Sequence, residues 1–142
     1  MKQGNKMENC LFCKINNSEI PAKKIAENEG AIAFLDINPI SYGHTLIVPK
    51  KHYRNLVETE NNDLDYVFSL TKEVCNKLER LNVGISGFNF LSNMNESAGQ
   101  VVMHFHLHVI PKYLDNSGLS LINNNKLLNN KEIEEKINTL VI

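Results

Sequence analysis

Several features that would assign a chain to a special class are scarce or missing. The 142 residues contain no tryptophan and three cysteines, and the net charge at pH 7 is −1. No apolar run approaches the ~20 residues that a membrane-spanning helix needs. The 15 basic residues are dispersed, so no basic surface for polymeric nucleic acid or anionic membranes is expected. An odd, small number of cysteines also argues against a disulfide scaffold. We therefore expect a soluble, cytoplasmic protein.

The length predicts one domain that buries roughly 70% of its unfolded surface. Residues 1–9 are polar, without the apolar segment of a signal peptide, and are expected to form a disordered lead. The folded domain is predicted over 10–113. Beyond it, 114–142 is predicted to form a polar loop and a short terminal helix, whose apolar face, with Ile133, Ile137 and Leu140, we expect to dock.

What the sequence does have is a run of three alternating histidines, His104, His106 and His108. A period of two is the period of a β-strand, so the three imidazoles should share one face. The residues between and after them, Phe105, Leu107 and Val109, should then face a core. Imidazole titrates near neutral pH, acts as a nucleophile or base, and binds metals. This segment is therefore the primary candidate for a functional site.

Apolar periodicity predicts the remaining elements. Strands are expected over 24–27, 31–36, 44–48 and 87–93, with the first two forming an antiparallel hairpin in which Gly30 supplies a positive φ. A long amphipathic helix is expected over 62–81, capped by Asn62 and followed by Gly84. Its predicted buried stripe comprises Leu64, Val67, Phe68, Val74, Leu78 and Leu81.

Two further features lie near the histidines. Cys10 and Cys13 form a C-x-x-C motif, and with histidines to spare a metal is favoured over redox chemistry, although two reduced thiols near the surface are an alternative. The small-residue loop over 93–100 leads directly into the histidine run. There Gly99 can bring backbone N–H groups close to an anion.

The combination of motifs resembles the histidine triad (HIT) family of nucleotide hydrolases and transferases. The matching segments occur in the family's order from Cys10 to Tyr113. They are Cys10-Leu11-Phe12-Cys13-Lys14-Ile15, Glu19-Ile20-Pro21-Ala22, Ala33-Phe34-Leu35-Asp36-Ile37-Asn38-Pro39, Gly43-His44-Thr45-Leu46-Ile47-Val48-Pro49-Lys50-Lys51-His52, Ala98-Gly99-Gln100 and the histidine triad itself. The resemblance implies an α+β fold with a meandering antiparallel sheet of about five strands, one long helix and a short C-terminal helix. It also implies a homodimer.

The resemblance further implies a nucleotidyl hydrolase. His106 would attack the α-phosphate of a purine nucleoside phosphoramidate or a related conjugate, form a nucleotidyl-histidine intermediate and release a nucleoside monophosphate. His108 would contact the phosphate and the leaving group, and His44 would orient the cluster. The implied nucleotide-binding residues, besides His106 and His108, are Leu11, Phe12, Ile15, Ile20, Phe34, Asp36 and Ile37 for base and ribose, and Asn93, Gly99, Gln100 and Val101 for phosphate.

A structural zinc ion is implied by the resemblance to prokaryotic members and to the related galactose-1-phosphate uridylyltransferases. Its ligands would be Cys10, Cys13, His52 and His104, a closed Cys2His2 set. Two departures bear on substrate choice. Val101 stands where phosphoramidase members often have serine, and the segment after Pro111 lacks the Gly-rich, Trp-containing tail of eukaryotic members.

Three alternatives remain at the level of sequence. The same chemistry could act on dinucleoside polyphosphates, which differ only in leaving group. The chain could instead be a nucleotide-binding dimer without catalysis. The three histidines could also hold a catalytic metal, but no acidic residue follows them as an evident base or orienting partner, which disfavours that reading.

Overall fold

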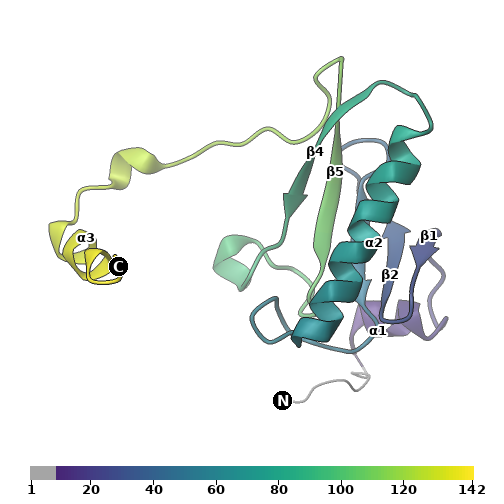
Figure 1. Ribbon diagram of the computed structural model, residues 1–142, viewed down its shortest axis with the longest axis horizontal. Coiled ribbons are helices and arrows are strands. Elements are labelled where there is room, and N and C mark those ends of the chain that lie inside the picture. The colour runs from purple at the N-terminus through teal and green to yellow at the C-terminus, as the bar shows by residue number, and fades with distance from the viewer. Residues whose placement is uncertain (1–8) are drawn as a thin grey trace.

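The computed structural model describes residues 9–142, so the lead predicted over 1–9 lies almost wholly outside the described residues (Figure 1). The elements are α1 (Leu11–Asn16), β1 (Lys24–Glu27), β2 (Ala31–Leu35), β3 (Thr45–Pro49), α2 (Asn61–Glu79), β4 (Ile85–Leu91), β5 (Leu107–Tyr113) and α3 (Lys131–Asn138). Short 3-10 turns cover Glu96–Ala98 and Asn125–Leu127. The predicted α+β class is confirmed.

The strands form one antiparallel sheet in the order β1-β2-β3-β5-β4. The central strand β3 is buried along its whole length, as its unbroken apolar run predicts. The β1–β2 hairpin is also confirmed, but Gly30 does not have a positive φ. Asn28 holds this turn by accepting the N–H groups of Gly30 and Ala31, and Gly30 is needed because a Cβ there would clash with the Tyr66 ring.

The long helix α2 covers one face of the sheet (Figure 1). Asn62 lies inside it, so the predicted cap is wrong; Glu60 precedes the first turn and makes no side-chain cap bond. Two members of the predicted stripe, Phe68 and Leu81, are 45% and 63% exposed, and Leu70 is buried instead. Within residues 9–142 no helix, α2 included, is long and apolar enough to cross a bilayer.

Each face of the sheet has its own apolar cluster. The face under α2 takes alternate residues of β2, β3 and β5, together with buried positions of the helix, namely Ala31, Ala33, Ile47, Val67, Leu70, Val74, Phe105, Leu107 and Val109. The opposite face takes the intervening residues and packs them against α1, namely Cys10, Phe12, Cys13, Ile32, Phe34, Leu46 and Val48. The period of two in each strand thus separates a structural face from the face that carries the histidines.

The segment after β5 extends away from the sheet and carries α3 to a position apart from the domain (Figure 1). The apolar residues of α3 and its flank are exposed, with Ile133 at 57%, Ile137 at 59% and Leu140 at 73%. This helix therefore does not dock on the domain of its own chain, and its docking on another chain stays a prediction. Its eight residues form a helix whose apolar stripe faces solvent.

Candidate active site

The three alternating histidines lie at the start of β5 but only His108 is within the strand, which begins at Leu107. The predicted strand is therefore too long at its start. The reason is that the N–H of Phe105 donates to the carbonyl of Tyr53, in the loop after β3, instead of to a neighbouring strand. The alternation nevertheless persists, because Phe105, Leu107 and Val109 all enter the core under α2 while the histidines take the other face.

His106 is held in one tautomer by its own backbone. Its Nδ1 lies 2.8 Å from the carbonyl oxygen of His104, which can only accept, so Nδ1 carries the proton. In the neutral ring the lone pair is then on Nε2. The carbonyl of His106 itself accepts from the Ser92 hydroxyl at 2.9 Å, which ties the residue to the segment just after β4. His106 therefore has the form that a nucleophilic imidazole needs.

A hydrogen-bonded relay runs through His44 to His108. The Ile40 N–H donates to Nδ1 of His44 at 3.0 Å, which puts the His44 proton on Nε2. That nitrogen lies 2.9 Å from Nδ1 of His108 and 3.5 Å from the Asp36 carboxylate. His108 therefore accepts at Nδ1 and carries its own proton on Nε2. This ring packs edge-on against His106, with centroids 4.9 Å apart, so a protonated ring nitrogen of His108 accompanies the unprotonated Nε2 of His106.

Burial keeps these imidazoles neutral. It lowers the pKa of His106, which is 7% exposed, and the pKa of His44. Burial, reinforced by the neighbouring His106 and His44, lowers the pKa of His108 to about 4. Burial is also the main cause that lowers the pKa of His104 to about 4. A neutral His106 at pH 7 retains the lone pair that nucleophilic attack requires.

Asp36, His44 and His108 place potential metal ligands within 4.8 Å of one another. Their hydrogen bonds favour a proton relay over a metal site. Because the Ile40 N–H occupies the lone pair on Nδ1 of His44, the nitrogen that faces Asp36 and His108 is the protonated one. A metal ligand has to present a lone pair.

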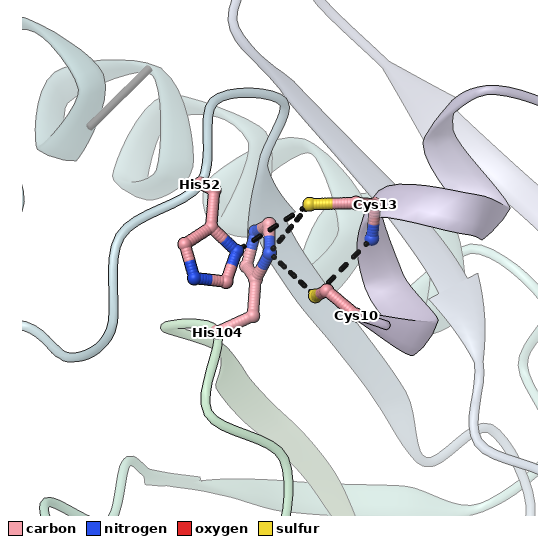
Figure 2. A group of neighbouring side chains, drawn as sticks. All are labelled: Cys10, Cys13, His52 and His104. Carbon is pink, nitrogen blue, oxygen red and sulfur yellow. Dashed lines mark hydrogen bonds between the residues drawn. The ribbon is translucent and has the colours of Figure 1, made fainter. Parts of the chain in front are cut away.

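A second cluster, which we call the Cys2His2 cluster, comprises Cys10, Cys13, His52 and His104 (Figure 2). The cysteines come from the start of α1, His52 from the loop after β3, and His104 from the segment before β5. The distances from sulfur to Nδ1 are 3.3 Å for Cys10–His104, 3.6 Å for Cys13–His104 and 3.4 Å for Cys13–His52. Ligands on a tetrahedral zinc ion stand about 3.6 Å apart for a sulfur and a nitrogen. The four side chains therefore fit such an ion.

The tautomer of His104 supports the same fit. Its Nε2 lies 2.9 Å from the carbonyl of Pro49, so this nitrogen donates and Nδ1 directs its lone pair at the two sulfurs. An outer hydrogen bond of this kind is what orients a metal-binding histidine. The ring is completely buried, where an imidazole needs partners on both nitrogens.

Two adjoining cavities lie beside the histidine face, and Pro21 and Ala22 line both. One, of about 360 Å³, has Ile15, Ile20 and Phe34 in its walls. The other, of about 640 Å³, has Asp36, Ile37 and His44. The structure thus brings five of the residues that the resemblance assigns to base and ribose to the walls of these cavities. Leu11 and Phe12 are not among the lining residues; Leu11 is 40% exposed, and Phe12 is buried against the histidines.

The residues expected to hold phosphate are on the loop before the histidine segment. Gly99 has a φ of 105°, and Asn93 lies so close that a Cβ on Gly99 would be 3.0 Å from its Nδ2. Val101 is 87% exposed. The Gln100 side chain is buried and bonds to the carbonyls of Arg54 and Val102 and to the Asn95 N–H. The backbone N–H groups of Gly99 and Gln100 also donate within the loop, to the carbonyls of Glu96 and Asn95, so neither is directed at a ligand.

The groups that sequence analysis missed are mostly backbone groups. The Ile40 N–H and the carbonyls of Pro49 and His104 set the tautomers of three histidines. Any residue carries these groups, so no pattern of residue types could have identified them. The contact of Phe12 with His106 was also missed, because an aromatic residue between two cysteines resembles ordinary core.

The chain is similar to known proteins over most of its length. The HIT domain model matches residues 17–115. An uncharacterized HIT-like protein of Borreliella burgdorferi is 42% identical over 130 residues, which are 91% of each chain. Adenosine 5'-monophosphoramidase hnt1 of Schizosaccharomyces pombe is 38% identical over 112 residues, 79% of this chain and 80% of that one. Adenylylsulfatase HINT3 of Arabidopsis thaliana is 40% identical over 103 residues, 72% of this chain and 52% of its own.

Solved structures of HIT-family proteins have the same fold as this chain. The crystal structure of a HIT family protein from Bacillus anthracis matches with a TM-score of 0.80 at 35% identity, over 94% of this chain and 95% of that one. A histidine triad nucleotide-binding protein from Candida albicans matches with a TM-score of 0.74 at 32% identity, over 92% and 96%. The chain belongs to the HIT domain family.

Proposed function

We propose that this protein is a nucleotidyl hydrolase that cleaves purine nucleoside phosphoramidates, or related nucleotide conjugates, through a nucleotidyl-histidine intermediate. The observation that carries the proposal is the neutral, tautomer-fixed imidazole of His106 beside a protonated Nε2 on His108. The activities named for two relatives, on adenosine monophosphoramidate and adenylylsulfate, support α-phosphate chemistry with different leaving groups.

In the proposed first step, Nε2 of His106 attacks the α-phosphorus, a P–N bond forms, and the bond to the leaving group breaks. The leaving group takes the proton from Nε2 of His108. In the second step, water attacks the same phosphorus and gives a proton to Nε2 of His108, the P–N bond breaks, and a nucleoside monophosphate leaves. His44 and Asp36 keep His108 in its donor tautomer. Asn93 and the N–H of Val101 would meet the phosphate charge, since the N–H groups of Gly99 and Gln100 donate within the loop.

Trapping the intermediate tests this proposal. Wild-type protein and the His106→Ala variant would be mixed with an adenosine phosphoramidate, quenched in alkali to preserve the P–N bond, and weighed intact. We expect one adenylyl group on the wild type and none on the variant. If the wild type shows no adduct and no turnover while AMP still binds, the protein is a nucleotide-binding module. With a dinucleoside polyphosphate the adduct would have the same mass, so the relative rates of the two substrates identify the preferred leaving group.

We also propose that the Cys2His2 cluster holds a structural zinc ion. Four protein ligands fill a tetrahedral shell and leave no position for substrate, so the ion would serve to join α1, the loop after β3 and the segment before β5. Metal analysis of purified protein should find about one zinc per chain, lost in Cys13→Ser. Cys75→Ser is the matched control, because Cys75 lies on α2 in the opposite core and should leave the zinc in place. Zinc retained by Cys13→Ser would contradict the assignment.

The proposed assembly is a homodimer in which two sheets join along β4. This strand is at the edge of the sheet and carries Phe90, which is 53% exposed and stacks with Phe88. A strand edge with an exposed aromatic side chain is a natural site for pairing with another chain.

A further inference from the structure

His104 belongs to both clusters of the histidine face at once. Its ring is part of the Cys2His2 cluster, with Nδ1 at 3.3 Å and 3.6 Å from the two sulfurs. Its main-chain carbonyl accepts the hydrogen bond that fixes the tautomer of His106. The ring is anchored on its other side by Pro49. Any displacement of His104 therefore moves the acceptor on which the nucleophile depends.

Phe12 makes a second connection between the same two clusters. It lies between Cys10 and Cys13 in sequence, near the start of α1, and its side chain is 3% exposed. The ring stands edge-on to His106, with centroids 5.0 Å apart, and to His104, with centroids 5.8 Å apart. On the remaining side it contacts Phe34, a wall residue of the smaller cavity, with centroids 5.6 Å apart.

The His106 ring is thus bounded by Phe12 and His108 and tethered by the His104 carbonyl. The torsion that turns an imidazole about its bond to Cβ is broad, so packing and hydrogen bonds must select one orientation. A half-turn would put Cδ2 in the place of Nδ1 and Cε1 in the place of Nε2, which would break the bond to the His104 carbonyl and remove the Nε2 lone pair from the phosphate side. The correct orientation therefore depends on contacts that surround the ring.

We propose that Phe12 and the His104 carbonyl are positioning groups for the nucleophile, and that they are held in place by closure of the Cys2His2 cluster. The cluster would then act on catalysis without touching substrate, through α1 and through the backbone between His104 and His106. This inference rests on the proposed hydrolase function for its kinetic consequence. Its structural consequence, the tautomer of His106, can be measured independently.

The first test reads the tautomer directly. Long-range proton–nitrogen NMR spectra of 15N-histidine protein distinguish a ring protonated at Nδ1 from one protonated at Nε2, and His106→Asn assigns the signal. In metal-loaded protein we expect His106 as a single Nδ1–H species. After removal of the metal with a chelator we expect a mixture of both tautomers. A His106 signal that stays entirely Nδ1–H in the metal-free protein would overturn the link through His104.

The second test isolates Phe12 without removing the metal. Phe12→Leu keeps apolar volume but loses the aromatic edge that faces the histidines. Phe34→Leu is the matched control, because the ring contact given for Phe34 is with Phe12 and not with His104 or His106. We expect tautomer mixing in Phe12→Leu only, with zinc content equal in both variants. Phe34→Leu should instead weaken AMP binding. Equal His106 spectra in wild type and Phe12→Leu would refute the role of Phe12.

The third test is kinetic. The rate of adenylyl-adduct formation should fall by roughly 10- to 100-fold in metal-free protein and in Phe12→Leu, the range typical when an outer orienting contact is lost. AMP affinity should change less than the rate does. Rates that fall only in proportion to AMP affinity would indicate a general loss of structure and would contradict positioning. Absence of an adduct in the wild type would refute the hydrolase function. The tautomer measurements would still show whether Phe12 and the His104 carbonyl position the His106 ring.

Discussion

His104 and His106 are two residues apart, yet the backbone gives their rings opposite tautomers. His104 donates from Nε2 to Pro49 and so presents Nδ1 to the thiols, whereas His106 donates from Nδ1 to the His104 carbonyl and so presents Nε2 outward. A metal ligand and a nucleophile both require a lone pair, but at different nitrogens. Which nitrogen of each histidine keeps a free lone pair therefore depends on which nitrogen donates a hydrogen bond to a main-chain carbonyl.

The low pKa of His108 predicts a loss of stability in acid. Burial sets the folded pKa at about 4, below the unfolded value near 6.5. Between these values the unfolded chain binds a proton that the folded chain does not, so the free energy of unfolding falls as pH decreases from 6.5 to 4. We expect this residue to account for about 1 kcal/mol between pH 7.5 and 5, after discounting for its partial exposure.

Urea unfolding of wild type and His108→Gln at the two pH values measures this contribution. Glutamine can accept from Nε2 of His44 but does not titrate, so the variant should lose less stability than the wild type. Loss of metal in acid affects both proteins alike and cancels in the difference. Equal losses in the two proteins would show that His108 does not titrate differently on folding.

Among the elements, the loop that leads into the histidine segment depends on Gly99. Its φ of 105° is costly for other residues, by about 1–3 kcal/mol, and a Cβ there would press on Asn93. We expect Gly99→Ala to weaken AMP binding by roughly tenfold, since about 1.4 kcal/mol corresponds to a factor of ten. Titration calorimetry measures the affinity.

Gly84 supplies the control for this loop. It has a similar φ of 100°, but it lies between α2 and β4, where an added Cβ would meet only Tyr113 at 4.0 Å. Gly84→Ala should therefore lower the melting temperature and leave AMP affinity unchanged. If both variants bind AMP equally well, the loop at Gly99 does not form part of the phosphate site.

Elements that depend on apolar periodicity were predicted well, and those that depend on local polar partners were not. The alternation of Phe105, Leu107 and Val109 correctly placed the histidines on one face, and the run 44–48 correctly indicated a central strand. The start of β5 was wrong because the partner of Phe105 is a loop carbonyl. The predicted cap of α2 was wrong because an asparagine can precede a helix or lie within its first turn. The residue type of Asn62 therefore could not show that the helix begins just after Glu60.

The Cys2His2 cluster shows the same limit for the site. The resemblance to the HIT family predicted that its four residues lie together, and the fold brings their ligand atoms within 4.8 Å of one another. Phe12, which the resemblance assigned to the base pocket, is buried beside both histidines and against Phe34. Periodicity reports which side of an element a residue faces, but not which of several neighbours it meets there.

At the scale of the whole molecule, the segment after β5 contributes nothing to the core that the single chain builds. Most of its large apolar side chains are exposed, among them Leu121 at 76%, Ile122 at 96% and Leu128 at 84%. An eight-residue helix such as α3 is also marginal unless its apolar stripe is covered. Within residues 9–142 no contact covers that stripe, so a stable α3 requires contact with another molecule. In the proposed homodimer that molecule is the second copy of the chain.

This arrangement predicts that deleting 119–142 affects stability only through association. Because the deleted residues are outside both cores and the β4 edge is retained, the truncated chain should dimerise more weakly and should melt below the full-length chain at each concentration. The full-length chain should melt at a temperature that rises with concentration, since a second copy stabilises the folded state by mass action. Melting curves from about 1 to 100 μM, with molar masses from light scattering, measure both. A full-length chain that is monomeric, with a melting temperature independent of concentration, would show that the segment finds no cover on a second copy.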